Sequence, residues 1–417
     1  MASGEATASR AVPFAVVATL VAGVLTYVLL GIVSRGLDTP GFDAFSVFWS
    51  VSLLVGFGVF VPFEQELARA AASGADVRSD LRSLVPLAAM LALAASAASL
   101  AIGVMAVGAD SAPLLVAFAL IGPVSAVQFV ARGLMLGRGR IRRYATVLIV
   151  DSVLRVLFAL LVGAVVQGSS MDVAWFAFGL LGAIALAHLG VLADARGGSR
   201  AEVVARRASW SAVIGLLGAG LASQVLLNAG PIAVDVVGAP EGATGAFQAT
   251  FNIARIPIFV LVPLQALLLA PFVRVFAVGQ AALARRVLAW IGGAFALVSV
   301  VGGVVALFIG PWLVELVFGP GRQLDSLSTA ILVAGACLYA GLVILTQALV
   351  SVRRHRIASR IWVGALAVAA LSALGIELVS RDIVWAVGCG FAMGSAVGFI
   401  VAVVDLSRPT AREKESS

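Results

Sequence analysis

The chain has 417 residues, of which 61% are hydrophobic and only 12% are charged, and its mean hydropathy is +1.10. This composition lies far outside the range of water-soluble domains and excludes a soluble protein. The net charge of +7, from 28 basic and 21 acidic residues, does not indicate nucleic-acid binding, because the arginines lie in short gaps between apolar segments. The sequence therefore predicts an all-α polytopic membrane protein.

Twelve apolar segments are long enough to cross a bilayer, which takes roughly 20 helical residues for about 30 Å of hydrocarbon. In chain order, the predicted membrane helices cover residues 11–33, 44–63, 83–108, 113–136, 144–166, 173–193, 209–230, 244–271, 288–309, 327–350, 361–379 and 383–404. The first segment is long enough to span, so we interpret it as a membrane helix and not as a cleavable signal. Residues 231–243 either extend the seventh helix or form a loop.

The basic residues give an orientation for these helices. With a cytoplasmic N-terminus, most of the arginines fall in cytoplasmic segments, whereas the outer segments keep only Arg35, Arg322 and Arg381. The even number of helices then places both termini in the cytoplasm, and we expect a multi-pass protein of the plasma membrane. The loops are short on both sides, which leaves no room for a catalytic domain outside the membrane.

The two halves of the chain contain similar strings about 200 residues apart. Pro40 corresponds to Pro240 and Pro62 to Pro263, with an offset of 200 and 201 residues, although chance similarity between apolar segments is the alternative. Both strings flank helices that run from outside to inside, so the pattern predicts a parallel duplication of six helices. The expected domains are an N-terminal lobe, a cytoplasmic linker, and a C-terminal lobe with a short cytoplasmic tail, at residues 1–193, 194–208 and 209–417.

The motifs of common catalytic sites are missing. The sequence has no HExxH, P-loop or GxSxG motif, and its only cysteines and histidines are Cys337, Cys389, His188 and His355, which are too few and too scattered for a metal cluster. We therefore expect no enzyme activity, no cofactor, no metal and no nucleic-acid partner.

The eighth predicted helix carries a polar stripe. Gln248, Asn252 and Arg255 are spaced by four and three residues, so they share one helix face, and Arg255 falls near the middle of the span. Ionisable groups in hydrocarbon cost at least about 2.5 kcal/mol and usually face a cavity or a partner. The stripe therefore predicts either a substrate cavity that binds an anion or an ion pair between helices.

Other helices carry polar residues in pairs. Gln224 and Asn228 are four apart on the seventh helix and either line the cavity or join helices by hydrogen bonds. Asp151 and Arg155 on the fifth helix are spaced to neutralise each other, or to open during ion coupling. Glu64 ends the second helix, where it forms either a gate with a basic partner or a solvated helix end.

Three features are interpreted as structural. Arg132 lies close enough to the cytoplasmic end of its helix for its side chain to reach water. Gly390, Gly394 and Gly398 repeat every four residues and predict close packing of the last helix. Residues 311–320 are aromatic and apolar, and we expect them to lie at the membrane interface before the tenth helix.

Four strings resemble a known family. They are TYVLLGIVSR at 26–35, FSVFW at 45–49, PFEQELAR at 62–69 and NIARIP at 252–257. The chain resembles the actinobacterial Wzx-like oligosaccharide flippases, which belong to the polysaccharide-export branch of the multidrug/oligosaccharidyl-lipid/polysaccharide (MOP) superfamily. The resemblance covers the whole chain in topology.

The resemblance implies two six-helix lobes around a cavity that opens alternately to each side of the membrane. It implies a transporter that flips a polyprenyl-pyrophosphate-linked oligosaccharide to the outer leaflet for cell-surface polysaccharide biosynthesis, with membrane lipids and glycan-assembly membrane proteins as partners. Arg255, Asn252 and Gln248 match the cavity stripe of the eighth helix, and Gln224 and Asn228 match the seventh. The first two helices depart from the family pattern because they lack a mid-span arginine.

Three alternatives stay open. A multidrug or small-metabolite antiporter of the same superfamily would need a buried acid such as Asp151 as its ion site. A membrane-embedded glycan polymerase or ligase would usually need a large outer loop with catalytic residues, which the predicted topology lacks. A lipid II flippase typically has two more helices than the twelve predicted here.

Overall fold

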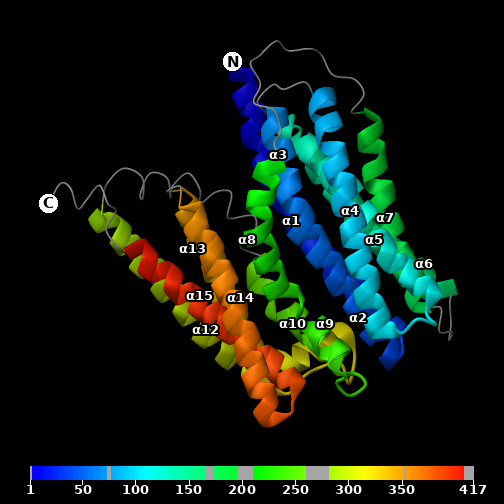
Figure 1. Cartoon of the computed structure of the whole chain (residues 1–417), viewed down its shortest axis with the longest axis vertical. Coiled ribbons are helices and arrows are strands. Elements are labelled where there is room, and N and C mark those ends of the chain that lie inside the picture. The colour runs from blue at the N-terminus through cyan, green and yellow to red at the C-terminus, as the bar shows by residue number, and fades with distance from the viewer. Residues whose placement is uncertain are drawn as a thin grey trace. The chain divides into compact units, whose positions relative to one another are not determined.

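The structure is a computed structural model that describes residues 2–72, 77–165, 172–194, 210–259, 281–351 and 354–407. Within these ranges every regular element is a helix, which confirms the predicted all-α class (Figure 1). In the described part of the chain, ten helical segments are long and apolar enough to cross a membrane, and a bent helix pair adds one more candidate span. The ten correspond one to one to ten of the predicted membrane helices. The seventh predicted helix corresponds to the bent pair, and the eighth lies only partly within the described residues.

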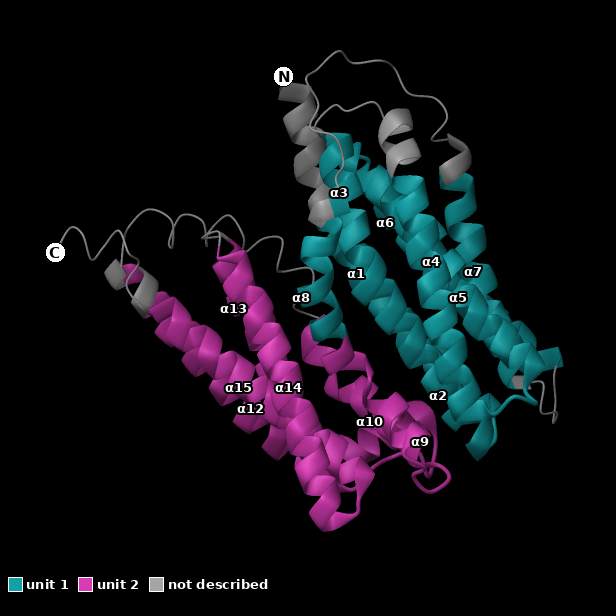
Figure 2. Ribbon diagram, viewed as in Figure 1, with its two compact units in different colours: residues 1–224 teal, residues 225–417 magenta. Residues whose placement is uncertain are grey.

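The chain divides into two compact units, residues 1–224 and 225–417 (Figure 2). The division falls inside α8 (Trp210–Asn228). The predicted linker at 194–208 lies outside the described residues, apart from Asp194 at the end of α7 (Asp172–Asp194). The lobe boundaries drawn from the sequence stay a prediction.

Unit 1 is built around α5, which contacts α3, α4 and α7, while α1 and α7 pack against α6. The helices that precede α7 in this unit are α1 (Ala2–Gly36), α2 (Thr39–Leu53), the π-helix η1 (Leu54–Phe60), α3 (Val61–Ala72), α4 (Val77–Val107), α5 (Ala112–Gly137) and α6 (Ile141–Val165). The second predicted membrane helix is therefore one helical segment, Thr39–Ala72, with a π-helical stretch inside it.

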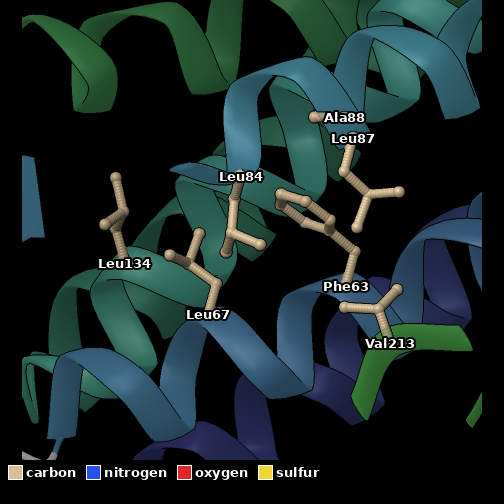
Figure 3. Close-up of a cluster of buried hydrophobic side chains, with 7 residues drawn as sticks. All are labelled: Phe63, Leu67, Leu84, Leu87, Ala88, Leu134 and Val213. Carbon is tan, nitrogen blue, oxygen red and sulfur yellow. The ribbon is translucent and has the colours of Figure 1, made fainter. Parts of the chain in front are cut away.

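A buried apolar cluster joins four helices of unit 1. Figure 3 shows its members, which are Phe63 and Leu67 of α3, Leu84, Leu87 and Ala88 of α4, Leu134 of α5 and Val213 of α8. Phe63 and Leu67 are one helical turn apart and present one face of α3 to the cluster. Lipid is as apolar as these side chains, so the cluster stabilises the unit through close packing and not through removal from water.

Glycine and serine bring α4 and α5 into close contact. A Cβ atom added at Gly122 would lie 2.2 Å from the Ala92 carbonyl oxygen. The Ser96 hydroxyl on α4 donates a 2.6 Å hydrogen bond to the Ala119 carbonyl on α5. The backbones can approach this closely only because position 122 has no side chain.

Unit 2 contains the end of α8 and six further described helices. These are α9 (Gly230–Val236), α10 (Ala243–Ala254), α12 (Ala281–Phe318), α13 (Ser326–Ser351), α14 (His355–Ser380) and α15 (Ile383–Ser407). A Cβ atom at Gly394 would lie 2.5 Å from the Ala365 carbonyl oxygen of α14, and one at Gly390 would lie 2.6 Å from that of Ala369. The predicted close packing of the glycine stripe on α15 is confirmed.

Two segments of unit 2 differ from expectation. Residues 231–243 combine the two expected arrangements: α9 follows α8 as far as Val236 at a bend of 62°, with Pro231 in its first turn, and residues 237–242 form the loop before α10. Residues 311–318 continue α12 as regular helix, so the connection between the ninth and tenth predicted helices is reduced to residues 319–325. Proline is tolerated inside membrane helices when neighbouring groups satisfy the freed backbone carbonyl.

Asp325 caps α13. Its Oδ1 accepts hydrogen bonds from the amides of Leu327 and Ser328 at 2.9 and 3.0 Å, and its Oδ2 accepts one from the Ser328 hydroxyl. Burial alone would raise the pKa of Asp325, but these hydrogen bonds outweigh burial and hold the pKa below its ordinary value.

We expect Asp325→Ala to lower the free energy of unfolding by about 1 kcal/mol, the usual cost of losing an N-cap. The part of this stabilisation that depends on the charge of Asp325 is fully present above the pKa that the aspartate has in the unfolded chain. It is lost as the pH falls through the lower pKa that the aspartate has in the folded protein. Unfolding in detergent at neutral and progressively lower pH would test this, with Asp325→Asn as the control that keeps the cap. A difference between wild type and Asp325→Ala that grows as the pH falls would contradict the prediction.

Candidate functional site

Arg255 lies at a break in the eighth predicted helix. It is the residue after the last turn of α10, and its amide donates to the carbonyls of both Phe251 and Asn252, at 3.0 and 3.2 Å. Pro257 follows two residues later and cannot donate the backbone hydrogen bond that a continuous helix would need. Residues 260–271 of the predicted helix lie outside the described residues.

The guanidinium of Arg255 is held by two amide side chains. Its Nη1 donates to Asn228 Oδ1 and its Nη2 to Asn252 Oδ1, each at 2.8 Å, and its central carbon lies 4.7 Å from the centre of the Phe251 ring. The residue is 3% exposed. Both amides are neutral, so these two bonds orient the guanidinium without cancelling its charge.

Gly230, at the start of α9, explains how the side chain of Asn228 reaches Arg255. A Cβ atom at Gly230 would lie 2.5 Å from the ring of Phe247, so the chain after α8 can pass directly against α10. The structure thereby joins Arg255, Asn252 and Asn228 within unit 2.

The two glutamines of the predicted site have separate surroundings. Gln248 is buried in α10, one turn before Asn252. Gln224 belongs to unit 1, where its Cβ lies 3.3 Å from the position that a Cβ on Gly58 would take.

Glu64 forms a buried ion pair in unit 1. Its Oε2 lies 3.6 Å from Nε of Arg132, and Glu64 is 6% exposed. Arg132 also donates from Nη2 to the Tyr144 hydroxyl at 2.7 Å and stacks on the rings of Phe129 and Tyr144, at 4.9 and 5.3 Å from their centres. Of the two arrangements left open for Glu64, the structure has the one with a basic partner.

The interpretation of Arg132 as a side chain that reaches water is wrong. The Arg132 side chain is only 12% exposed, and Gly133 beside it would place a Cβ atom 3.0 Å from the Glu64 carbonyl oxygen, so α3 and α5 are in close contact next to the arginine. The signal in the sequence was the glycine next to an arginine, on a helix whose neighbour ends in glutamates. Tyr144, the hydrogen-bond partner of Arg132, was not singled out.

Asp151 and Arg155 pair on α6 as predicted. Arg155 donates from Nε and Nη2 to the two carboxylate oxygens of Asp151 at 2.9 and 2.5 Å, and Asp151 is 2% exposed. His188 of α7 is also buried, and its Nδ1 lies 2.8 Å from the Ile184 carbonyl oxygen. The described residues contain no group of three or more His, Cys, Asp or Glu side chains that could hold a metal ion.

The relatives found by sequence comparison are uncharacterized proteins, and the solved structures similar to this chain include transporters. No family model matches the chain. Uncharacterized proteins of Mycobacterium bovis and Mycobacterium tuberculosis are each 29% identical over 418 residues, which covers 96% of this chain and 93% of theirs.

Solved structures of MATE proteins are similar to this chain. An inward-facing MATE family transporter of the MOP superfamily has a TM-score of 0.69 at 14% identity and covers 94% of both chains. An outward-facing one has a TM-score of 0.66 at 13% identity, covering 98% of this chain and 97% of that one. A MATE protein in complex with MaL6 has a TM-score of 0.63 at 14% identity, covering 98% and 96%. The chain is therefore a multi-pass membrane protein with the fold of the MOP superfamily transporters.

Proposed function

We propose that the protein is a non-enzymatic flippase that moves a polyprenyl-pyrophosphate-linked oligosaccharide from the cytoplasmic to the outer leaflet of the plasma membrane. The transport would occur by alternating access, with both termini in the cytoplasm, and would supply cell-surface polysaccharide biosynthesis. The observation that carries the proposal is the Arg255 guanidinium, buried at a helix break and oriented by Asn228 and Asn252.

The chemistry of Arg255 suits a pyrophosphate. A guanidinium is planar, stays charged, and can donate two parallel hydrogen bonds to phosphate oxygens. Interrupted helices at membrane depth occur where the backbone is buried in protein or lines a cavity, and their ends commonly form substrate sites in transporters. In the proposed mechanism Arg255, Asn252, Asn228, Gln248 and Gln224 bind the polar part of the substrate while the prenyl chain stays in the lipid.

The buried charges of unit 1 are assigned to coupling. No nucleotide-binding motif is present in the sequence, so net transport must draw on an ion gradient, the membrane potential or removal of the product. Asp151 with Arg155, and Glu64 with Arg132, are buried pairs whose opening would change local charge. A substrate or ion drives the change between states only if it binds the two states with different affinity.

A MATE-like antiporter of drugs or small metabolites is the second candidate. The structural neighbours include multidrug resistance transporters, and Glu64 and Asp151 are buried carboxylates that an antiporter could load and unload. The charge of Arg255 separates the two candidates, because it attracts a pyrophosphate and repels a cationic drug.

Transport in reconstituted vesicles tests the proposal. We expect Arg255→Ala to slow translocation of a fluorescent prenyl-pyrophosphate sugar about tenfold or more, since a charge-assisted hydrogen bond contributes about 1.5–3 kcal/mol. Arg255→Lys keeps the charge but loses the planar fork, and should retain an intermediate rate. Arg354→Ala is the matched control, because it removes another arginine of unit 2 that pairs with Asp405.

Transport of two substrates, the prenyl-pyrophosphate sugar and a cationic dye, distinguishes the flippase from the antiporter. Translocation of the prenyl-pyrophosphate sugar by the wild type, with selective loss in Arg255→Ala, supports the flippase. Uptake of a cationic dye alone, unchanged or increased in Arg255→Ala, would establish the antiporter instead. A wild-type rate of sugar translocation in Arg255→Ala would remove this residue from the substrate site.

A further inference from the structure

The second membrane segment changes its helical type in the middle. The stretch η1, Leu54–Phe60, is a π-helix continuous with α2 before it and α3 after it. In a π-helix each amide bonds to the carbonyl five residues back, so the stretch holds an extra residue relative to α-helix. Single π-helical turns inside α-helices are rare, and they are frequent at functional sites.

One ring from α5 packs against η1. Phe129 meets Phe57 edge-on, with ring centres 5.8 Å apart, and stacks on Phe60 at 6.3 Å. A Cβ atom at Gly56 would lie 3.2 Å from the same ring. The side chain of Phe129 therefore contacts the π-helix at three of its seven residues.

Phe129 connects η1 to the buried ion pair. The guanidinium carbon of Arg132 lies 4.9 Å from the centre of the Phe129 ring. Arg132 in turn pairs with Glu64, which lies four residues beyond the end of η1. A rotation of η1 that moves Phe57 and Phe60 would thus disturb the ring on which Arg132 rests.

The other side of η1 contacts α8 within unit 1. A Cβ atom at Gly58 would lie 3.3 Å from both Leu221 Cδ2 and Gln224 Cβ. Pro62, just after η1, faces Gly220, where a Cβ atom would lie 3.3 Å from its ring. Gln224, which we assign to substrate binding, therefore sits directly against the π-helix.

We propose that η1 is a register switch that couples α8 at Gln224 to the Glu64–Arg132 pair. When the extra residue of a π-helix moves along a helix, each residue that it passes rotates by about 100°, the angle of one residue in an α-helix. A movement of α8 against Gly58 then shifts the extra residue, rotates Phe57 and Phe60 away from Phe129, and separates Arg132 from Glu64. The switch rests on the transport activity proposed above but not on the identity of the substrate.

Deleting one residue tests the switch directly. Removal of Val59, a half-buried residue of η1, should convert the stretch to α-helix and leave α2 and α3 in their present register. We expect the deletion variant to fold with unchanged or higher stability but to transport about tenfold more slowly or worse, because the helix has lost its second register. Deletion of Ala94 from the regular helix α4 is the control: it rotates the following residues by about 100° and should prevent folding.

Hydrogen exchange measured by mass spectrometry gives a readout that requires no substrate. In the wild type, we expect the amides of 54–60 to exchange about tenfold faster or more than those of 45–51 in α2, and the difference to disappear in the Val59 deletion. The switch is overturned if wild-type protection is equal in both stretches, or if the folded deletion variant transports at the wild-type rate. If the deletion variant does not fold, the wild-type exchange pattern decides. If the wild type does not move the prenyl-linked sugar, the proposed substrate fails while the exchange measurement still reports on η1.

Discussion

Replacing Arg132 with methionine is expected to lower the free energy of unfolding by about 3–5 kcal/mol, the usual cost of removing one partner from a buried ion pair. Methionine fills most of the arginine stem, so the loss reports on charge and not on volume. Glu64 would stay enclosed between α3 and α5 without the guanidinium 3.6 Å from its carboxylate. The loss of the hydrogen bond to Tyr144 adds to the effect.

A pair that is more exposed on both sides provides the control. Arg354 pairs with Asp405 at 3.0 Å, and the two side chains are 23% and 19% exposed. Arg354→Met should therefore cost less than Arg132→Met, because water can partly replace the lost partner of Asp405.

Unfolding of both variants in the same detergent gives the comparison for Arg132. The double variant Glu64→Gln with Arg132→Met should recover most of the loss, since it leaves no unpaired buried charge. Equal small losses in the Arg354 and Arg132 variants would show that the Glu64–Arg132 pair is solvated.

The sequence predicts the helices well and their internal irregularities poorly. Apolar length and the distribution of arginines are enough to locate membrane helices, because a bilayer requires a fixed length of helix. The π-helix at 54–60 leaves no such trace: its residues are Leu, Val, Gly and Phe throughout, so a change in residues per turn moves no polar residue to a new face. The break at Arg255 was signalled by Pro257.

The sequence predicted contacts between site residues on the same helix, but not contacts between residues on different helices. Periodicity placed Asp151 and Arg155 on one face of α6, and their ion pair is confirmed. The contact of Arg255 with Asn228 depends on the close approach at Gly230, and the pairing of Glu64 with Arg132 depends on Gly133. Which helices approach each other closely is decided by small residues whose partners a single sequence does not identify.

Gly122→Val is expected to destabilise unit 1 by about 3 kcal/mol or more, or to prevent folding, because overpacking costs about 1–3 kcal/mol even where neighbours can move. Here the neighbour is backbone: the added Cβ would lie 2.2 Å from the Ala92 carbonyl oxygen and 3.0 Å from the Ser96 amide nitrogen. Separating α4 from α5 would also break the hydrogen bond from Ser96 to the Ala119 carbonyl.

The control for Gly122 is a glycine with open space around it. A Cβ atom at Gly163 on α6 meets nothing within 4 Å, so Gly163→Ala should raise stability by up to about 1 kcal/mol through better helix propensity. Gly122→Ala, measured by thermal unfolding in detergent, should lower stability although the chemical change is identical. If both alanine variants shift the unfolding temperature in the same direction, helix propensity outweighs close contact, and the α4–α5 interface is looser than its 2.2 Å approach implies. Opposite shifts would show that the interface is set by the missing side chain at position 122.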